Sequence, residues 1–104
     1  MAFVKNTTPT ALAGVLVTST SLGPTSEDNV TGNSSGKIYQ IAIDNSANPN
    51  STAYVKIADA SSATPASTAA NWIFPAKGGQ KITYIVDTGA PYTAGISIWC
   101  TSTP

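Results

Sequence analysis

Hydrophobic residues in this chain occur in short runs that are separated by polar and turn-forming residues. Four of these runs are AYVKIAD (53–59), NWIFPA (71–76), QKITYIV (80–86) and GISIWC (95–100), each of strand length and each bounded by Pro, Gly, Asn, Asp or Ser. Their apolar residues are mostly β-branched or aromatic, and no window shows the i, i+3, i+4, i+7 stripe of an amphipathic helix. The pattern predicts an all-β protein.

Alternation along each strand predicts which side chains face the core. One inward row is expected from each strand: Tyr39, Ile41 and Ile43; Val55 and Ile57; Trp72 and Phe74; Ile82, Tyr84 and Val86; and Ile96, Ile98 and Cys100. Residues 12–22 add a further strand, with Val15 and Val17 on one face and Leu16 on the other. Strands separated by turn-rich segments predict a small antiparallel β-sandwich or a partly closed barrel.

The segments between the strands predict how the chain turns. DNSANPNST (44–52) suits a loose hairpin connection, and the Gly-Gly of AKGGQ (76–80) suits a second hairpin. Residues 87–95 are expected to cross over to the last strand, and residues 65–71 to form a loop.

The chain has the length of one domain, with an N-terminal strand or arm and long polar loop in residues 1–36 and a β-sandwich core in residues 37–104. Roughly the first 20 residues have two interpretations. They either supply an edge strand of the parent sheet or reach over a neighbouring subunit, and the sequence does not separate these alternatives.

Composition indicates a thin core and a neutral surface. Ala supplies 15 of the 43 hydrophobic residues, and the single cysteine, Cys100, allows no intrachain disulfide. A small domain of this kind is expected to be stabilised by neighbouring copies, so we expect a homo-oligomer. Five Lys balance five acidic residues, which argues against nucleic-acid and membrane-surface partners.

The candidate chemistry is sparse. The chain has no His, which excludes a Ser-His-Asp set, and its carboxylates stand at turns or strand ends, at Glu27, Asp28, Asp44, Asp59 and Asp87. The oxygen-rich loops could hold a calcium ion, but their spacing matches no EF-hand, and local turn hydrogen bonds explain them more simply. We therefore expect no enzyme, cofactor or metal. The start MAFVKNTTPT lacks a secretory hydrophobic region, which predicts synthesis in the cytoplasm.

Two aromatic residues carry alternative interpretations. Trp99 and Tyr54 alternate with the inward rows of their strands, so both could lie on one outer surface. Trp99 could instead fill the core, because a central strand can bury both faces. The remaining interpretations are an intersubunit contact and a stacking platform for sugars.

Residues 54–60, 73–78 and 92–100 resemble the C-terminal half of small virion proteins of tailed bacteriophages. Those proteins carry a strand similar to YVKLYDA, a small-residue loop, a strand ending in VxPA before glycine, and a closing segment similar to F-A-T-G-L-S-x-A. This chain departs from them in having Ala58 where an aromatic residue is frequent and Tyr92 where Phe is frequent. The resemblance covers about half of the chain.

The resemblance implies a small β-sandwich on the virion: a capsid decoration or cement protein that binds the major capsid protein between capsomers at the capsid surface, with a trimer favoured. The alternatives are a host-attachment or carbohydrate-binding module of a tail or fibre, and a minor structural tail or neck subunit. Loops 18–36 and 87–95 are candidate contact surfaces. The candidate interface residues are Tyr54, Trp99, Tyr92, Glu27 and Asp28.

Overall fold

The computed structural model describes residues 3–6, 16–19, 22–32 and 34–104. Within these ranges the chain forms β-strands and no helix, which confirms the all-β prediction. The strands are β1 (Phe3–Asn6), β2 (Leu16–Ser19), β3 (Gly36–Asp44), β4 (Ala53–Ala58), β5 (Trp72–Ala76), β6 (Lys81–Tyr92) and β7 (Ser97–Thr101). Each segment predicted as a strand contains one, and β1 is additional.

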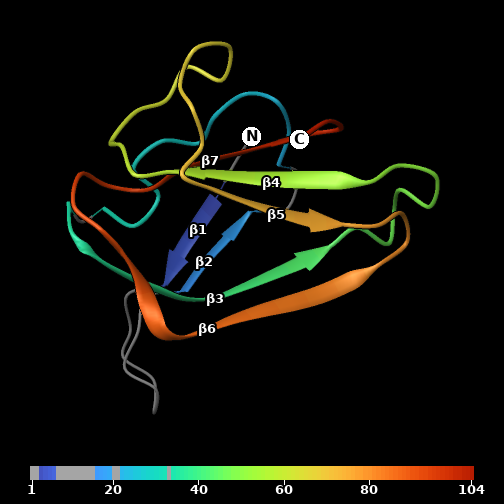
Figure 1. Ribbon diagram of the computed structural model, residues 1–104, viewed down its shortest axis with the longest axis horizontal. Helices are drawn as coiled ribbons and strands as arrows, with labels where there is room; N and C mark the ends of the chain where they lie inside the picture. The colour runs from blue at the N-terminus through green and yellow to red at the C-terminus, as the bar shows by residue number, and fades with distance from the viewer. Residues whose placement is uncertain (1–2, 7–15, 20–21, 33) are drawn as a thin grey trace.

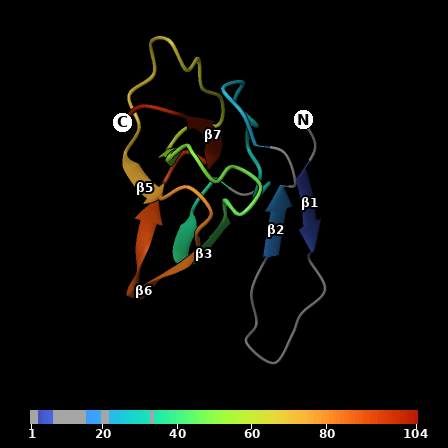
Figure 2. The ribbon, with the colours of Figure 1, turned by 90° about the vertical axis from the view of Figure 1, so that its right-hand side faces the viewer.

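The strands form two main antiparallel sheets that pack as an open sandwich. One sheet is the pair β3–β6 and the other has the order β5-β4-β7, and the two are not closed into a barrel (Figure 1). Strands β1 and β2 pair with each other as a separate hairpin, which stands to one side of the sandwich in Figure 2. The N-terminal strand is therefore part of its own hairpin among the described residues, rather than an edge strand of a main sheet.

Both predicted hairpins are wrong, because each connects strands of different sheets. Strand β3 pairs with β6, and β4 lies between β5 and β7, so the segments 45–52 and 77–80 each carry the chain from one sheet to the other. Strand β6 also continues to Tyr92, through most of the segment expected to cross over. The strand pattern located the strands but not their partners.

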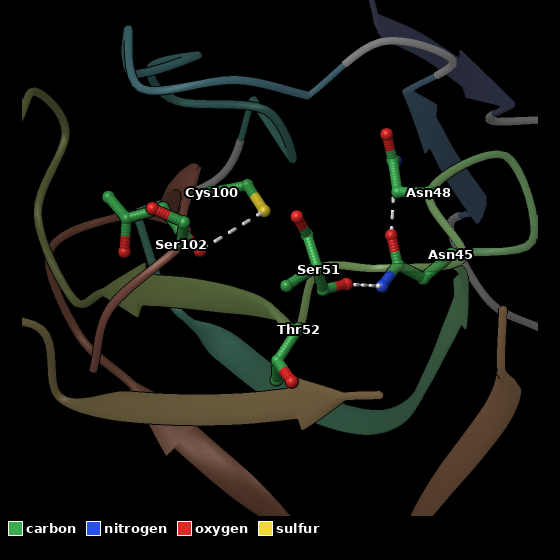
Figure 3. Close-up of a pocket in the computed structure, with 8 residues that line it drawn as sticks. Asn45, Asn48, Ser51, Thr52, Cys100 and Ser102 are labelled. Atoms are coloured by element: carbon green, nitrogen blue, oxygen red, sulfur yellow. Dashed lines mark hydrogen bonds between the residues drawn. The ribbon is translucent and has the colours of Figure 1, made fainter. Parts of the chain in front are cut away.

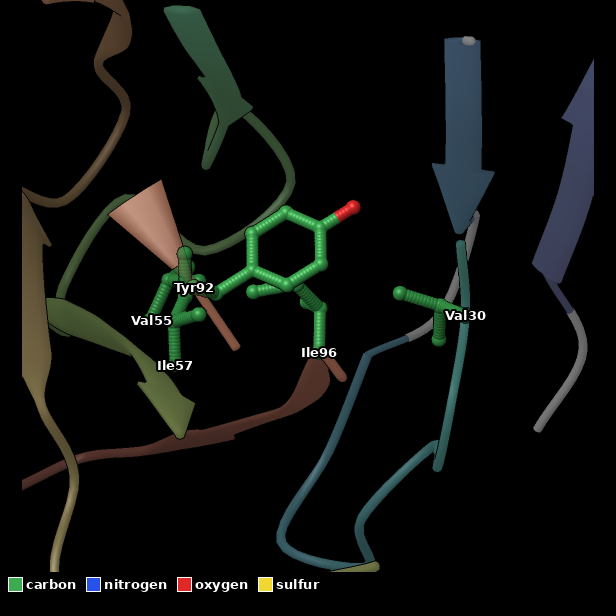
Figure 4. Packing of buried hydrophobic residues seen from close by; sticks show 5 residues of the cluster. All are labelled: Val30, Val55, Ile57, Tyr92 and Ile96. Carbon is green, nitrogen blue, oxygen red and sulfur yellow. The ribbon is translucent and has the colours of Figure 1, made fainter. Parts of the chain in front are cut away.

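Four of the five predicted inward rows contribute to the main core between the sheets, whereas Ile82, Tyr84 and Val86 of β6 are partly buried outside this cluster. Its buried residues are Val30, Val55, Ile57, Tyr92 and Ile96, shown in Figure 4. Partly buried residues of β3, β5 and β7 pack against them: Ile38, Ile41, Ile43, Trp72, Phe74, Ile98 and Cys100. Phe74 also contacts Tyr84 of β6, with ring centroids 5.1 Å apart. Val17 of β2 packs on the same cluster, while Val15 lies outside the described residues.

A β-bulge changes the predicted facing of β3. The register with β6 shifts between Ile38 and Gln40, where four residues of β6, 86–89, stand opposite the single residue Tyr39 of β3. The shift turns Ile38 towards the core and leaves Tyr39 57% exposed, the reverse of the prediction.

A second, smaller core lies on the other face of the three-stranded sheet. Trp99 is 1% exposed there, packed with Ala58 and Ala63 under the loop 59–71. The strand β7 thus buries side chains on both of its faces, and small alanines allow the loop to approach the sheet closely.

The polar segment 22–32, expected to be a surface loop, lies along the free edge of β7. Its backbone exchanges two hydrogen bonds between Glu27 and Ile98, of 2.8 and 2.9 Å, and Val30 N–H donates to Ile96 O at 2.9 Å. Val30 is 2% exposed. This segment therefore completes the sheet edge and contributes to the main core.

Candidate functional site

Side chains that could ligate a metal do not gather into a site within the part of the chain that the structure describes. The described residues include no group of three or more potential metal-ligating side chains. They also include no helix that is both long and apolar enough to cross a membrane. Any site has to be found among surfaces and turns.

Two carboxylates, those of Asp59 and Asp44, accept hydrogen bonds from backbone N–H groups. Asp59, at the end of β4, accepts from the backbone N–H groups of Thr93 and Ala94 at 2.8 to 3.0 Å, and these bonds, the Ala94 bond foremost, lower the pKa of Asp59. Asp44 accepts from the Oγ and N–H of Ser46, which lowers the pKa of Asp44. Asp44 has the turn-forming role that the sequence predicted, whereas Asp59 bonds to residues that are distant in sequence and ties the end of β4 to the segment after β6.

Three of the five candidate interface residues are buried within the chain and are not available on its surface, which for Trp99 confirms the alternative interpretation as a core residue. Trp99 is 1% exposed, Tyr92 is 6% exposed and Glu27 is 5% exposed. Trp99 fills the second core, and the Tyr92 side chain lies across Gly36 of the neighbouring strand. Glu27 is fixed within the fold, because its backbone pairs with β7 and its Oε2 accepts a hydrogen bond from Ser19 Oγ at 2.6 Å.

The other two candidate residues reach solvent. Asp28 is exposed, although its Oδ1 accepts from the N–H of Ala63 at 3.1 Å while Ser26 Oγ donates to Ala63 O at 2.8 Å. Tyr54 is half-buried on the outer face of β4. Of the predicted set, only Tyr54 is both aromatic and accessible.

A hollow of about 150 Å³ lies where the turn 45–52 meets the end of β7 (Figure 3). Asn45, 3% exposed, closes one side, and its Nδ2 donates to the carbonyls of Ser51, Ala76 and Lys77 at 2.8 to 3.1 Å. Its Oδ1 accepts from Asn48 Nδ2 at 3.1 Å. Since these polar groups already bond to one another, the hollow is the surface of a structural turn rather than a binding site.

An apolar surface, which we call the β4–β5 patch, consists of Tyr54, Ile73 and Pro75. The register pairs Tyr54 with Pro75 and Lys56 with Ile73, so all four residues share the outer face of the three-stranded sheet. Ile73 is 44% exposed and Pro75 is also exposed. The half-buried Lys56 lies between Ile73 and Trp99 across the sheet.

A second surface, which we call the β3–β6 face, is the outer face of the two-stranded sheet. Its outward residues are Lys37, Tyr39, Gln40, Ala42 and Asp44 on β3, and Lys81, Thr83 and Ile85 on β6. Ile85 is 70% exposed, the largest value among the exposed large hydrophobic residues of the described chain. Lys37 and Tyr39 lie over Gly89, because a Cβ atom there would meet both side chains within 2.9 Å.

Sequence reasoning missed both Ile85 and Tyr39 as surface residues. Ile85 could have been found, because it alternates with the inward residues Tyr84 and Val86. Tyr39 could not, because its exposure depends on the bulge, and the bulge depends on the pairing with β6.

Comparison of this chain with known protein families, with curated proteins and with solved structures returned no match.

Proposed function

We propose that this chain is a structural virion protein of a tailed phage, a capsid decoration protein that stabilises the head by binding the major capsid protein between capsomers. The observation that carries the proposal is the β4–β5 patch: Ile73 is 44% exposed on the outer face of a sheet, in a domain whose described residues form no metal-ligating cluster. Exposed apolar side chains grouped on one face are typical of protein contact surfaces.

The patch supports binding by burial of apolar area rather than by charge. Removal of apolar surface from water contributes about 25 cal/mol per Å². The net charge is zero, so long-range attraction to a charged shell contributes little. The contributions of many equivalent sites to the stability of the shell would then add up, because each bound copy increases the free energy needed to separate the shell subunits that it touches.

The carbohydrate-binding alternative has less support than the decoration protein, because only Tyr54 of its two aromatic residues is accessible. A sugar platform built on Trp99 needs an open ring, and Trp99 is 1% exposed. The minor tail or neck subunit remains distinct from the decoration protein in one measurable respect, which is the number of copies on each virion.

The proposal is tested by cosedimentation of the purified chain with heads of the phage that encodes it, prepared without this protein. We expect saturable binding of roughly hundreds of copies to each head, because equivalent sites repeat over the surface lattice. The double variant Y54S/I73Q is expected to bind about tenfold more weakly or worse, because it removes the apolar side chains of the patch. Ala66→Gln, an exposed change in the loop 59–71, is the matched control and should bind as the unaltered chain does.

Two results would contradict the proposal. One is the absence of binding to heads. The other is a copy number of only a few per virion on a stained gel, which would favour the tail or neck subunit.

A further inference from the structure

We infer that the β3–β6 face is a self-association surface, on which a second copy of this chain docks face to face about a two-fold axis that lies between the copies and runs across the strands. The inference concerns the purified chain alone, so it does not depend on the capsid role proposed above. It rests on the relief of the face and on the arrangement of its charges.

On this face, projecting apolar side chains lie next to a hollow along the strands. Ile85, 70% exposed, and Tyr39, 57% exposed, project near the middle of the sheet. The next cross-strand pair along the sheet is Ala42 with Thr83, whose side chains are small, and the pair after it is Asp44 with Lys81. These two pairs, with Ile43 and Ile82 between them, line a hollow of about 290 Å³.

The hollow opens outwards. Four of its six lining residues, Ala42, Asp44, Lys81 and Thr83, are exposed on the outer face, and none comes from the three-stranded sheet that covers the inner face. A projection and a hollow about three residues apart along β6 correspond to roughly 10 Å, at the rise of an antiparallel strand. A two-fold axis midway between them would insert Ile85 of each copy into the hollow of the other copy.

The same operation brings opposite charges together. It reverses the strand direction of the second copy, so that the end of β3 with Lys37 approaches the end with Asp44 on the other chain. Lys81 likewise approaches the region of the exposed Asp87. Because a two-fold axis repeats each contact, the interface would hold each of these attractions twice.

This charge arrangement points to a second copy as the occupant. The face has Lys37 at one end and Lys81 at the other, and Asp44 lies 4.0 Å from Lys81 within one chain. A strongly charged partner would meet repulsion at one end or the other, whereas a copy turned by 180° matches both. The two-fold pair replaces the trimer as the smallest unit that we expect in solution.

The first experiment is sedimentation equilibrium of the full chain from low to high micromolar concentration. We expect a monomer–dimer equilibrium, and we expect Ile85→Gln to raise the dissociation constant about tenfold or more. Since Ile85 is exposed in the single chain, this variant should keep the circular dichroism spectrum of the unaltered chain and, at concentrations where both chains are monomeric, its unfolding midpoint. Ile73→Gln is the matched control on the β4–β5 patch and should leave the dimer unchanged.

The second experiment uses charge reversal to test the two-fold arrangement. Lys37→Glu and Asp44→Lys each place like charges at the contact, so each variant alone should dimerise more weakly. A mixture of the K37E and D44K chains should form mixed dimers more readily than either variant dimerises alone, because every contact in the mixed pair is again between opposite charges.

Several results would overturn the inference. They are a chain that stays monomeric at high concentration, a dimer that is insensitive to Ile85→Gln or lost with Ile73→Gln, a trimer that Ile85→Gln does not affect, or variant chains that show no preference for mixing. If the unaltered chain is monomeric and Ile85→Gln weakens its binding to phage heads, the face binds the shell and the second copy is not its occupant. Loss of head binding by Y54S/I73Q with an intact dimer would leave both proposals standing separately.

Discussion

At the scale of single residues, Asn45 holds together the two turns that carry the chain between the sheets. Its side chain is buried, and its backbone N–H donates to Gln80 O at 2.8 Å while its carbonyl accepts from Gly79 N–H at 3.1 Å. The turns also touch directly, because a Cβ atom on Gly78 would come within 2.4 Å of Pro49 O. One side chain therefore replaces the hydrogen bonds that a paired hairpin would have supplied.

Replacement of Asn45 by Ala is expected to lower the free energy of unfolding by about 2 to 4 kcal/mol, because buried carbonyls of both turns lose their donor. Urea denaturation followed by tryptophan fluorescence measures this difference. Asn48→Ala, which removes only the donor to Asn45 Oδ1 at the exposed turn, is the control and should cost about 1 kcal/mol or less. Equal losses in the two variants would contradict the central role of Asn45.

Asp59 predicts how stability depends on pH. Hydrogen bonds from the segment 93–94 lower the pKa of Asp59 in the folded chain below its ordinary value of 3.8, with the Ala94 N–H as the largest cause. A lowered folded pKa means that the stabilisation is present above pH 3.8 and is lost as the pH falls through the folded pKa. The free energy of unfolding should therefore fall on acidification below about pH 4, and Asp59→Asn should make this fall smaller.

Urea denaturation of both chains near neutral pH and at about pH 2.5 tests this dependence. A fall of the same size in the two chains would show that the Asp59 hydrogen bonds do not contribute to it. The pKa of Asp44 is also lowered, so part of the fall should persist in the variant.

At the scale of elements, the segment 22–32 and the loop 59–71 support each other over Trp99. Ser26 and Asp28 bond to both backbone groups of Ala63, and Ser97 Oγ donates to Ala60 O at 2.8 Å. The loop is thus fixed to the sheet edge by polar contacts on one side and by the alanine contacts with Trp99 on the other.

The double variant S26A/D28A is expected to loosen this loop without unfolding the sandwich. Hydrogen exchange of the amides between Ala60 and Asn71 should become about tenfold faster, because two hydrogen bonds to Ala63 are lost. Exchange within β3 and β6 should not change, and the exposed neighbour Thr25→Ala should behave as the unaltered chain does. A uniform increase across all strands would mean that the contacts stabilise the whole molecule instead.

The elements themselves could be predicted from the sequence, whereas their pairing could not. Alternation and turn residues report on each strand separately, and they placed Val55, Ile57, Ile96 and Ile98 correctly towards the core. Neighbouring strands were expected to form hairpins, but β3 pairs with β6 because the Asn45 contacts join the two turns instead. The candidate surface failed for the same reason, since the burial of Trp99, Tyr92 and Glu27 comes from segments that are distant in sequence.

At the scale of the whole molecule, the described chain packs as one small body with its two apolar surfaces on different sheets. Its Cα radius of gyration is 13.2 Å, close to the roughly 13 Å typical of a compact domain of 100 residues. The β4–β5 patch and the β3–β6 face lie on the outer sides of the two sheets. A pair of copies joined through the β3–β6 face would therefore present two β4–β5 patches, one for each of two shell subunits.

The edges of the three-stranded sheet limit how such an assembly can grow. Along β7 the edge is occupied by the hydrogen bonds of Glu27 and Val30, and β5 carries Pro75, which has no N–H to offer. An open edge is the usual template for adding strands from further chains, and the same property leads to fibres when it is left uncontrolled. With both edges of this sheet obstructed, strands of further chains find no open template on it, so any assembly of copies is expected to form through faces rather than by extension of this sheet.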